Sequence, residues 1–222
     1  MRDYILFDLD GTLTDPKEGI TKSVQYALDH YGIHVEDLNS LIPFIGPPLM
    51  DSFEEFYGFS PRQAREGVQV YREYFTDRGW RENEVFPGIP QMLGKLKAAG
   101  KKLYVATSKP EVFALRILDH FGLTEYFDGV GGADLEETRT KKADVIRYLL
   151  ERENIPSAEG KERTRILMVG DREHDVLGAA QAGLDCVGVL YGYGSRQELE
   201  ESGAWAIAES VEELTELLLE QP

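Results

Sequence analysis

The amino-acid sequence predicts an α/β fold, a doubly wound and mostly parallel sheet with a helical unit inserted after its first strand. Short apolar runs alternate with helical segments from about residue 84 onwards, and this alternation is typical of consecutive βαβ units. Residues 16–83 show helical periodicity without a strand-like run. We therefore expect residues 1–15 and 84–222 to form the α/β core, and residues 16–83 to form a helical cap.

The first predicted strand is the apolar run of residues 4–7, and carboxylates follow it directly. A continuous apolar run suits a strand that is buried on both faces of a parallel sheet. Side chains two positions apart in a strand point the same way, so Asp8 and Asp10 should emerge together at its carboxyl end. Ligands bind at this edge in open α/β sheets. Two carboxylates at close range repel each other by about 1–4 kcal/mol, so the pair favours a bound cation.

The helical insert carries two clear helix starts. Asp15, Pro16 and Glu18 supply a cap, a proline in the first turn and a following carboxylate, and Ser60 begins a second start. Apolar residues then recur at helical spacing, namely Ile20, Val24, Ala27, Leu28 and Tyr31 in the first helix, and Ala64, Val68, Tyr71 and Phe75 in the second. Residues 44–49 contain one glycine and two prolines, which indicates either a plain connector or a loop that faces the substrate.

The remaining elements are expected in an alternating order. They are helix 89–99, strand 103–106, helix 111–121, strand 127–131, helix 142–153, strand 165–169, helix 174–182, strand 186–190, strand 205–208 and helix 211–219. The polar stretch 156–164 is interpreted as a surface loop.

Composition narrows the range of partners. The chain has 24 basic and 40 acidic residues and a net charge of -16, which disfavours nucleic-acid polymers and anionic membranes as partners. Small soluble substrates are more consistent with this charge. The single cysteine, Cys186, excludes an internal disulfide and is interpreted as a core residue of a strand. No apolar stretch reaches the length of a signal sequence or membrane span, so we expect a cytoplasmic protein.

Hydroxyl side chains follow the predicted strand 103–106. Thr107 and Ser108 stand before a helix start, where hydroxyls and backbone amides suit phosphate oxygens. The same pair is also typical of an ordinary helix cap. Lys109 is interpreted as a solvated helix residue.

Two adjacent lysines open the predicted helix 142–153. Lys142 shares its helical stripe with the apolar Ile146 and Leu149, whereas Lys141 points to the side of Val145. An ammonium at this place could neutralise phosphate charge. We select Lys142, and Lys141 remains possible.

A further apolar strand, residues 166–169, delivers carboxylates at its carboxyl end. Asp171 follows it after one glycine, and Asp175 follows four residues later. His174 stands at the start of a helix, where a histidine is more often exposed than a ligand.

Together these motifs resemble the haloacid dehalogenase superfamily of phosphohydrolases. Residues 8–13 fit its opening pattern DxDGT[LV] in full, and the strand that ends at Thr107 resembles its second motif. Lys142 resembles the third motif, although many relatives carry proline where this chain has Ala143. Residues 170–175 resemble the motif GDxxxD.

The resemblance implies both a mechanism and a set of site residues. Asp8 would be the nucleophile that forms an aspartyl-phosphate, and Asp10 would be the general acid and base. The phosphate-binding residues would be Thr107, Ser108 and Lys142. The metal ligands would be Asp8, the backbone carbonyl of Asp10, and Asp171. Asp175 would support these ligands without binding the metal itself. Because these ligands are all oxygens, Mg²⁺ is favoured over zinc. A helical cap in the family closes over this edge of the sheet.

The substrate is expected to be a small phosphorylated metabolite. The chain looks closest to the phosphoglycolate phosphatase and 5'-nucleotidase-like branch, and residues 140–148 and 188–195 favour the nucleotidase-like members. We expect nucleoside 5'-monophosphates, with phosphoglycolate or another small metabolite as the alternative. Phe44 could stack on a base or pack in the core.

Other protein classes fit less well. A signalling receiver domain lacks the helical insert, and the phosphate-binding lysine loop of a nucleotide-dependent kinase is missing. Dehalogenase chemistry does not use the second aspartate, so Asp10 argues against it. A phosphosugar mutase keeps both aspartates and remains an alternative, as does a phosphate-binding protein without catalysis.

Overall fold

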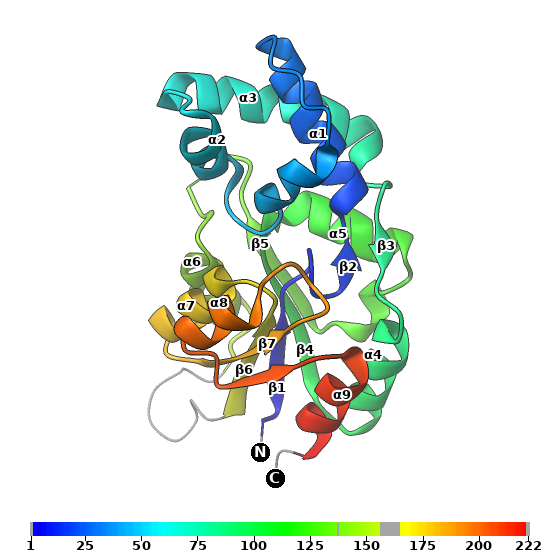
Figure 1. The fold of residues 1–222 in the computed structure, drawn as a ribbon. Coiled ribbons are helices and arrows are strands. Elements are labelled where there is room, and N and C mark those ends of the chain that lie inside the picture. The colour runs from blue at the N-terminus through cyan, green and yellow to red at the C-terminus, as the bar shows by residue number, and fades with distance from the viewer. Residues whose placement is uncertain (1, 137, 156–164, 221–222) are drawn as a thin grey trace. The chain divides into compact units, whose positions relative to one another are not determined.

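The computed structural model describes residues 2–136, 138–155 and 165–220 (Figure 1). The surface loop expected at 156–164 lies outside these residues. The chain divides into two compact units, Met1–Thr14 with Val85–Pro222, and Asp15–Glu84. Two short strands, β2 (Thr14–Asp15) and β3 (Glu84–Val85), form a two-stranded sheet where the chain passes from one unit to the other.

The first unit is built on a six-stranded sheet in the order β5-β4-β1-β6-β7-β8, and all its paired strands are parallel. The strands are β1 (Tyr4–Phe7), β4 (Lys102–Pro110), β5 (Gly129–Ala133), β6 (Ile166–Gly170), β7 (Asp185–Val189) and β8 (Ala206–Ala208). From β1 the chain adds strands first on one side and then on the other. The predicted α/β fold is confirmed, and β1 lies at the switch point where such sheets bind ligands.

Helices cover both faces of this sheet (Figure 1). On one side lie α6 (Lys142–Arg152), α7 (Glu173–Gln181) and α8 (Arg196–Glu201), and on the other lie α4 (Ile89–Ala98), α5 (Glu111–His120) and α9 (Val211–Glu220). A short 3-10 helix, η3 (Thr124–Tyr126), precedes β5. Among the helices that the structure describes, none combines the length and apolar character needed to cross a bilayer.

The apolar character of β1 follows from burial on both of its faces. Leu6 lies level with Tyr104 of β4 and Met168 of β6, and these side chains share one core with α6 and α7. Ile5 and Phe7, which point to the opposite face, are equally buried. Cys186 of β7 belongs to the same core as Leu6, as expected.

Strand β4 departs from the expected strand 103–106, because it runs on to Pro110. Its pairing with β5 shifts between Ala106 and Pro110, advancing four residues on β4 and only two on β5. Thr107 to Lys109 therefore form an irregular bulge at the carboxyl end of the strand. Bulges of this kind re-aim side chains and are frequent beside active sites.

The second unit is helical, with α1 (Lys17–His30), the 3-10 helix η1 (Leu38–Phe44), α2 (Leu49–Tyr57), α3 (Pro61–Tyr74) and the π-helix η2 (Phe75–Gly79). Helix α1 begins one residue later than expected, with Pro16 rather than Asp15 at the N-cap position, and Asp15 Oδ1 accepts a hydrogen bond from the amide of Lys17 at 3.0 Å. Phe44 is buried, and its ring lies 5.1 Å from that of Phe53 and 5.3 Å from that of Phe56. Phe44 is thus a core residue of this unit.

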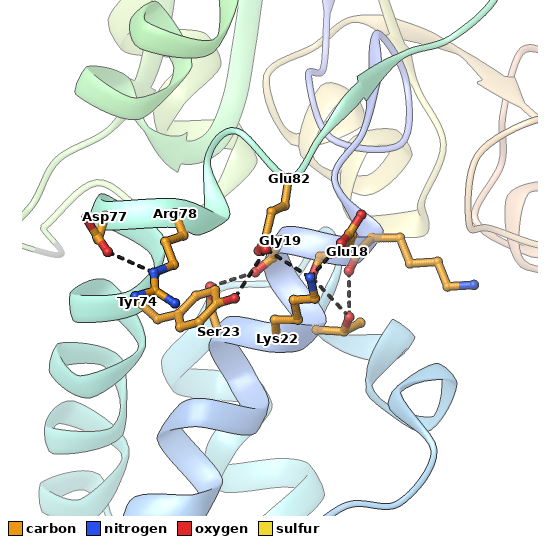
Figure 2. A network of polar contacts seen from close by, with 10 residues as sticks. Glu18, Gly19, Lys22, Ser23, Tyr74, Asp77, Arg78 and Glu82 are labelled. Carbon is orange, nitrogen blue, oxygen red and sulfur yellow. Dashed lines mark hydrogen bonds and ion pairs between the residues drawn. The ribbon is translucent and has the colours of Figure 1, made fainter.

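A close crossing ties the start of α1 to η2 (Figure 2). A Cβ atom at Gly19 would lie 1.9 Å from the carbonyl oxygen of Gly79, so only glycine fits there. The Gly19 amide donates to Glu82 O at 2.8 Å, and Lys22 Nζ lies 2.9 Å from Glu82 Oε1. Tyr74 donates its hydroxyl to the same Oε1 at 3.2 Å. The first and last segments of the helical unit are therefore joined.

Candidate active site

Strand register brings the predicted site residues to one edge of the sheet. Phe7 pairs with Val105 of β4 and with Val169 of β6, so these three strands end at nearly the same level. Asp8 follows Phe7 directly, and Thr107 and Asp171 each stand two residues beyond their paired valine. The carboxyl ends of β1, β4 and β6 thus form one site at the centre of the sheet.

Three buried carboxylates gather in this site. One oxygen from each of Asp8, Asp171 and Asp175 lies within 4.8 Å of the other two. Burial, together with the charges of Asp175 and Asp8, raises the pKa of Asp171 well above its ordinary value. Burial also raises the pKa of Asp175, although Lys142 opposes this shift. The cluster therefore concentrates negative charge where water cannot screen it.

Lys142 supplies part of the countercharge. Its Nζ lies 2.8 Å from Asp8 Oδ1, 2.8 Å from Asp175 Oδ1 and 3.0 Å from the carbonyl oxygen of Ala106. Burial alone would lower the pKa of Lys142, but the two carboxylates outweigh burial and raise it. Lys141 is exposed on the surface. Of the two candidate lysines, the structure places Lys142 in the site.

Lys109 is a functional candidate that sequence reasoning missed. It was expected as a solvated helix residue, and this expectation is wrong, because Lys109 lies buried in β4 and α5 begins only at Glu111. Its Nζ is 2.5 Å from Asp10 Oδ2. Burial raises the pKa of Asp10, and the Lys109 ammonium opposes that rise without cancelling it. No helical or strand periodicity predicts a residue in a bulge, so the sequence gives no signal for this contact.

The two hydroxyl residues occupy the bulge of β4. Thr107 is buried, and its Oγ1 accepts a hydrogen bond from the amide of Lys109 at 3.2 Å. Ser108 is half-buried. Both stand where the strand leaves the sheet, beside the end of β1. His174, which was interpreted as exposed, is half-buried at the start of α7.

A loop after β7 packs closely around Asp171. The amide of Tyr193 donates to Asp171 Oδ2 at 2.8 Å. A Cβ at Gly192 would lie 2.4 Å from Asp171 Cβ, and one at Gly194 would lie 1.9 Å from the Asp171 carbonyl oxygen. Two glycines spaced two apart after a buried strand are the sequence signal for this close approach. The loop thus fixes the position of the Asp171 carboxylate.

Further glycines make room for the charged side chains. Gly11 has φ +82°, and a Cβ there would lie 2.2 Å from Asp171 Oδ2. A Cβ at Gly170 would lie 2.2 Å from Asp175 Cγ, and one at Gly178 would lie 2.6 Å from Lys142 Cβ. The side chains of the site are therefore packed directly against backbone.

The donor set fits a hard divalent cation. Carboxylate oxygens are the ligands that Mg²⁺ prefers, and Asp8, Asp171 and Asp175 offer them at one buried place. Lys142 alone cannot balance three carboxylates. Burial and the neighbouring carboxylates both raise the pKa of Asp171, and a bound cation would offset them by favouring the charged form.

Comparisons with known proteins agree with this geometry. Residues 5–189 match the family model described as haloacid dehalogenase-like hydrolase. A 5'-nucleotidase of Pseudomonas aeruginosa is 52% identical over 195 residues, which are 88% of this chain and 86% of that protein. The tyrosine-protein kinase PtkA of Mycobacterium tuberculosis is 39% identical over 216 residues, 96% of this chain and 72% of its own length.

A solved structure supports the same assignment. The structure of a predicted phosphatase from Clostridium acetobutylicum superposes with a TM-score of 0.95 at 49% identity, and the match covers 99% of each chain. The chain therefore belongs to the haloacid dehalogenase-like hydrolase family, and it is a phosphatase of that family.

Proposed function

We propose that this phosphatase is a Mg²⁺-dependent phosphomonoester hydrolase that works through an aspartyl-phosphate on Asp8. The observation that carries the proposal is the place of Asp8, at the end of the central strand, within the carboxylate cluster and 2.8 Å from the Lys142 ammonium. A carboxylate in this position can attack phosphorus while fixed positive charge offsets the charge of the phosphoryl oxygens.

In the first half-reaction, an Asp8 oxygen attacks phosphorus in line with the ester oxygen. The electron pair of the breaking P–O bond passes to the leaving oxygen, which takes a proton from Asp10. In the second half-reaction, water attacks the phosphorus of the aspartyl-phosphate and gives its proton to Asp10. Inorganic phosphate leaves, and both carboxyl groups return to their starting states.

The other site residues bind and orient the phosphoryl group. Lys142 offsets charge beside Asp8, and Thr107 and Ser108 offer hydroxyl donors from the bulge of β4. Asp8, Asp171 and the backbone carbonyl of Asp10 would hold Mg²⁺, and Asp175 would support them through Lys142. The ion, when bound, supplies neutralisation of charge on the phosphoryl oxygens.

The proposed substrate class is the nucleoside 5'-monophosphates. The relative named 5'-nucleotidase supports this choice, since it shares 52% identity over most of both chains. Phosphoglycolate or another small phosphorylated metabolite is the alternative. The acidic chain and the single buried cysteine support a small substrate and a reducing cytoplasmic location.

The test is phosphate release from a panel that holds nucleoside 5'-monophosphates, phosphoglycolate and several sugar phosphates, with and without Mg²⁺. We expect Mg²⁺-dependent release, fastest from nucleotides, and none from the Asp8→Asn variant. Acid quenching with ³²P-labelled substrate should trap label on the protein only when Asp8 is present. Substantial activity of pure Asp8→Asn would contradict the mechanism.

Three outcomes would favour the alternatives. Faster release from phosphoglycolate would replace the nucleotide assignment, and isomerisation of a sugar phosphate without phosphate release would indicate a mutase. Because one relative is named a tyrosine-protein kinase, labelled ATP with a tyrosine peptide belongs in the panel. We expect phosphoryl transfer to water and no labelled peptide.

A further inference from the structure

The ion pair of Lys109 with Asp10 needs an explanation beyond stability. Both side chains are almost fully buried, with 5% and 10% of their surface exposed. Removing two charges from water costs several kcal/mol per ion, and well-packed apolar residues often replace such pairs without loss of stability. Stability alone therefore does not explain the Lys109–Asp10 pair. Its place at the edge of the sheet that holds the site suggests a role in the chemistry.

The two lysines of the site serve different carboxylates. Lys142 lies 2.8 Å from both Asp8 Oδ1 and Asp175 Oδ1, whereas Lys109 lies 2.5 Å from Asp10 Oδ2. They also come from different elements, α6 and the bulge of β4. Lys109 therefore does not duplicate the role of Lys142, which places positive charge beside Asp8.

The two oxygens of Asp10 have different surroundings. Oδ2 is held by Lys109, whereas Oδ1 is buried and accepts no hydrogen bond from any residue in the described ranges. Because Lys109 holds Oδ2, rotation of the carboxylate about its Cβ–Cγ bond is restricted. The orientation of Oδ1 is therefore fixed as well. The Thr107 hydroxyl, which accepts from the Lys109 amide, holds the backbone from which Lys109 reaches.

We propose that Lys109 is a positioning residue that anchors Asp10 Oδ2, so that Oδ1 is the atom that exchanges the proton with the leaving oxygen. This inference rests on the proposed function, in which Asp10 is the acid and base. When the P–O bond breaks, its electron pair passes to the leaving oxygen and the proton on Oδ1 follows. In the second half-reaction the same oxygen accepts the proton of the attacking water.

The dependence on the leaving group distinguishes this role from a structural one. An alkoxide, as from a nucleoside 5'-monophosphate, needs a proton as it departs, whereas 4-nitrophenolate does not. The value of kcat/KM reports the first half-reaction alone, since the aspartyl-phosphate forms there. Misplacing a general acid should therefore reduce kcat/KM for the alkyl ester and leave that for the aryl ester nearly unchanged.

The experiment compares Lys109→Met with wild type on a nucleoside 5'-monophosphate and on 4-nitrophenyl phosphate. We expect kcat/KM to fall about 100-fold on the nucleotide, within the range of general acid catalysis, and less than about 5-fold on the aryl ester. Lys109→Arg, which keeps the charge and the donors, should recover part of the loss. An equal loss on both esters would overturn the proposal, because it would indicate direct phosphate binding or a structural role; no loss would also overturn it.

Controls separate this inference from folding and from the proposed function. Lys101→Met removes another buried lysine of the same unit, which donates to Arg2 O at 2.8 Å, and it should leave the ratio of the two kcat/KM values unchanged. If Lys109→Met does not fold, Lys109→Gln takes its place in the same comparison. In an Asp10→Asn background, Lys109→Met should add no further loss on the nucleotide. Activity of Asp8→Asn tests the proposed function independently of all these variants.

Discussion

At the scale of single residues, the site is a balance of buried charges. Asp8, Asp171 and Asp175 share one region, and Lys142 is the ammonium that lies within 2.8 Å of two of them. Removing one partner of a buried ion pair is far more costly than exchanging both, because the remaining charge stays out of water. Lys142 should therefore matter for folding as well as for phosphate binding.

We predict that Lys142→Met lowers the free energy of unfolding by about 3–5 kcal/mol without added metal and abolishes phosphatase activity. The adjacent Lys141→Met is the matched control, since Lys141 is exposed, and it should change stability by less than about 0.5 kcal/mol. Urea unfolding of the three proteins measures both effects. Equal stabilities of the two variants would show that the charge of Lys142 does not stabilise the folded state.

Asp128 gives a prediction that depends on pH. Burial would raise its pKa, but the Leu103 amide at 3.0 Å and the Lys102 ammonium at 3.0 Å hold it below the usual 3.8. Because the folded pKa is depressed, the stabilisation by the charged form is complete above that usual value and is lost as the pH falls through the folded pKa.

We expect Asp128→Asn to lower the free energy of unfolding by about 1–2 kcal/mol at pH 7. The difference from wild type should shrink as the pH falls below about 4. Urea unfolding from pH 7 down to the lowest pH at which both proteins fold measures this trend. Asp144→Asn, at an exposed carboxylate that lies 3.1 Å from Arg147 Nη1, should show no comparable loss at pH 7. A difference for Asp128→Asn that grows towards acid pH would contradict the assignment.

At the scale of elements, the loop after β7 acts as a rigid support of the site. Tyr193 donates its amide to Asp171, and the two neighbouring glycines permit that approach. Gly194→Ala should reduce activity about 100-fold, because a Cβ placed 1.9 Å from the Asp171 carbonyl oxygen must displace the loop.

Gly94→Ala is the matched control for this substitution. A Cβ at Gly94, within α4, would have its nearest neighbour at 3.9 Å, so alanine should keep full activity and stabilise the helix by up to about 1 kcal/mol. Steady-state kinetics and thermal unfolding of both variants provide the measurement. Full activity of Gly194→Ala would mean that Asp171 does not depend on the loop.

The bulge in β4 shows where prediction from sequence ends. The apolar run and the carboxylates after it predict β1 and the place of Asp8, because strand periodicity is a local property. The apolar stripe of its helix singles out Lys142, which is the buried one of the two adjacent lysines. The sequence does not single out Lys109, because its burial depends on a register shift between β4 and β5 that no local pattern encodes. The six-residue helix α8 was also missed, since its charged sequence carries no apolar periodicity.

At the scale of the whole molecule, the order of elements predicts the sheet but not the detail of the helical unit. The βαβ alternation leads to the parallel sheet that the structure shows. In the helical unit, Phe44 could be read as a core residue or as a ring open to a base, and only its contacts with Phe53 and Phe56 decide for the core. Packing partners that are distant in sequence decide such cases.

The Gly19 crossing provides a prediction for the helical unit. Gly19→Ala should lower the stability of the full chain by at least about 2 kcal/mol, because the new Cβ would overlap the carbonyl oxygen of Gly79. Gly67→Ala in α3 is the control, since its Cβ would lie 3.5 Å from Phe53 in ordinary contact. Urea unfolding followed by circular dichroism compares the two, and equal midpoints would show that the crossing can relax.

The same crossing affects the order in which the chain can fold. β1 must pair with β4 across the entire helical unit, and closing so long a loop is slow and costs entropy. The helical unit makes its contacts within one continuous stretch, and the hydrogen bond from Gly19 to Glu82 brings its two ends together. Once this unit has formed, the loop left for the sheet to close is only as long as the segments on either side of it. The helical unit therefore affects the rate at which the sheet folds. Gly19→Ala should slow the refolding of the sheet, although Gly19 lies outside the sheet.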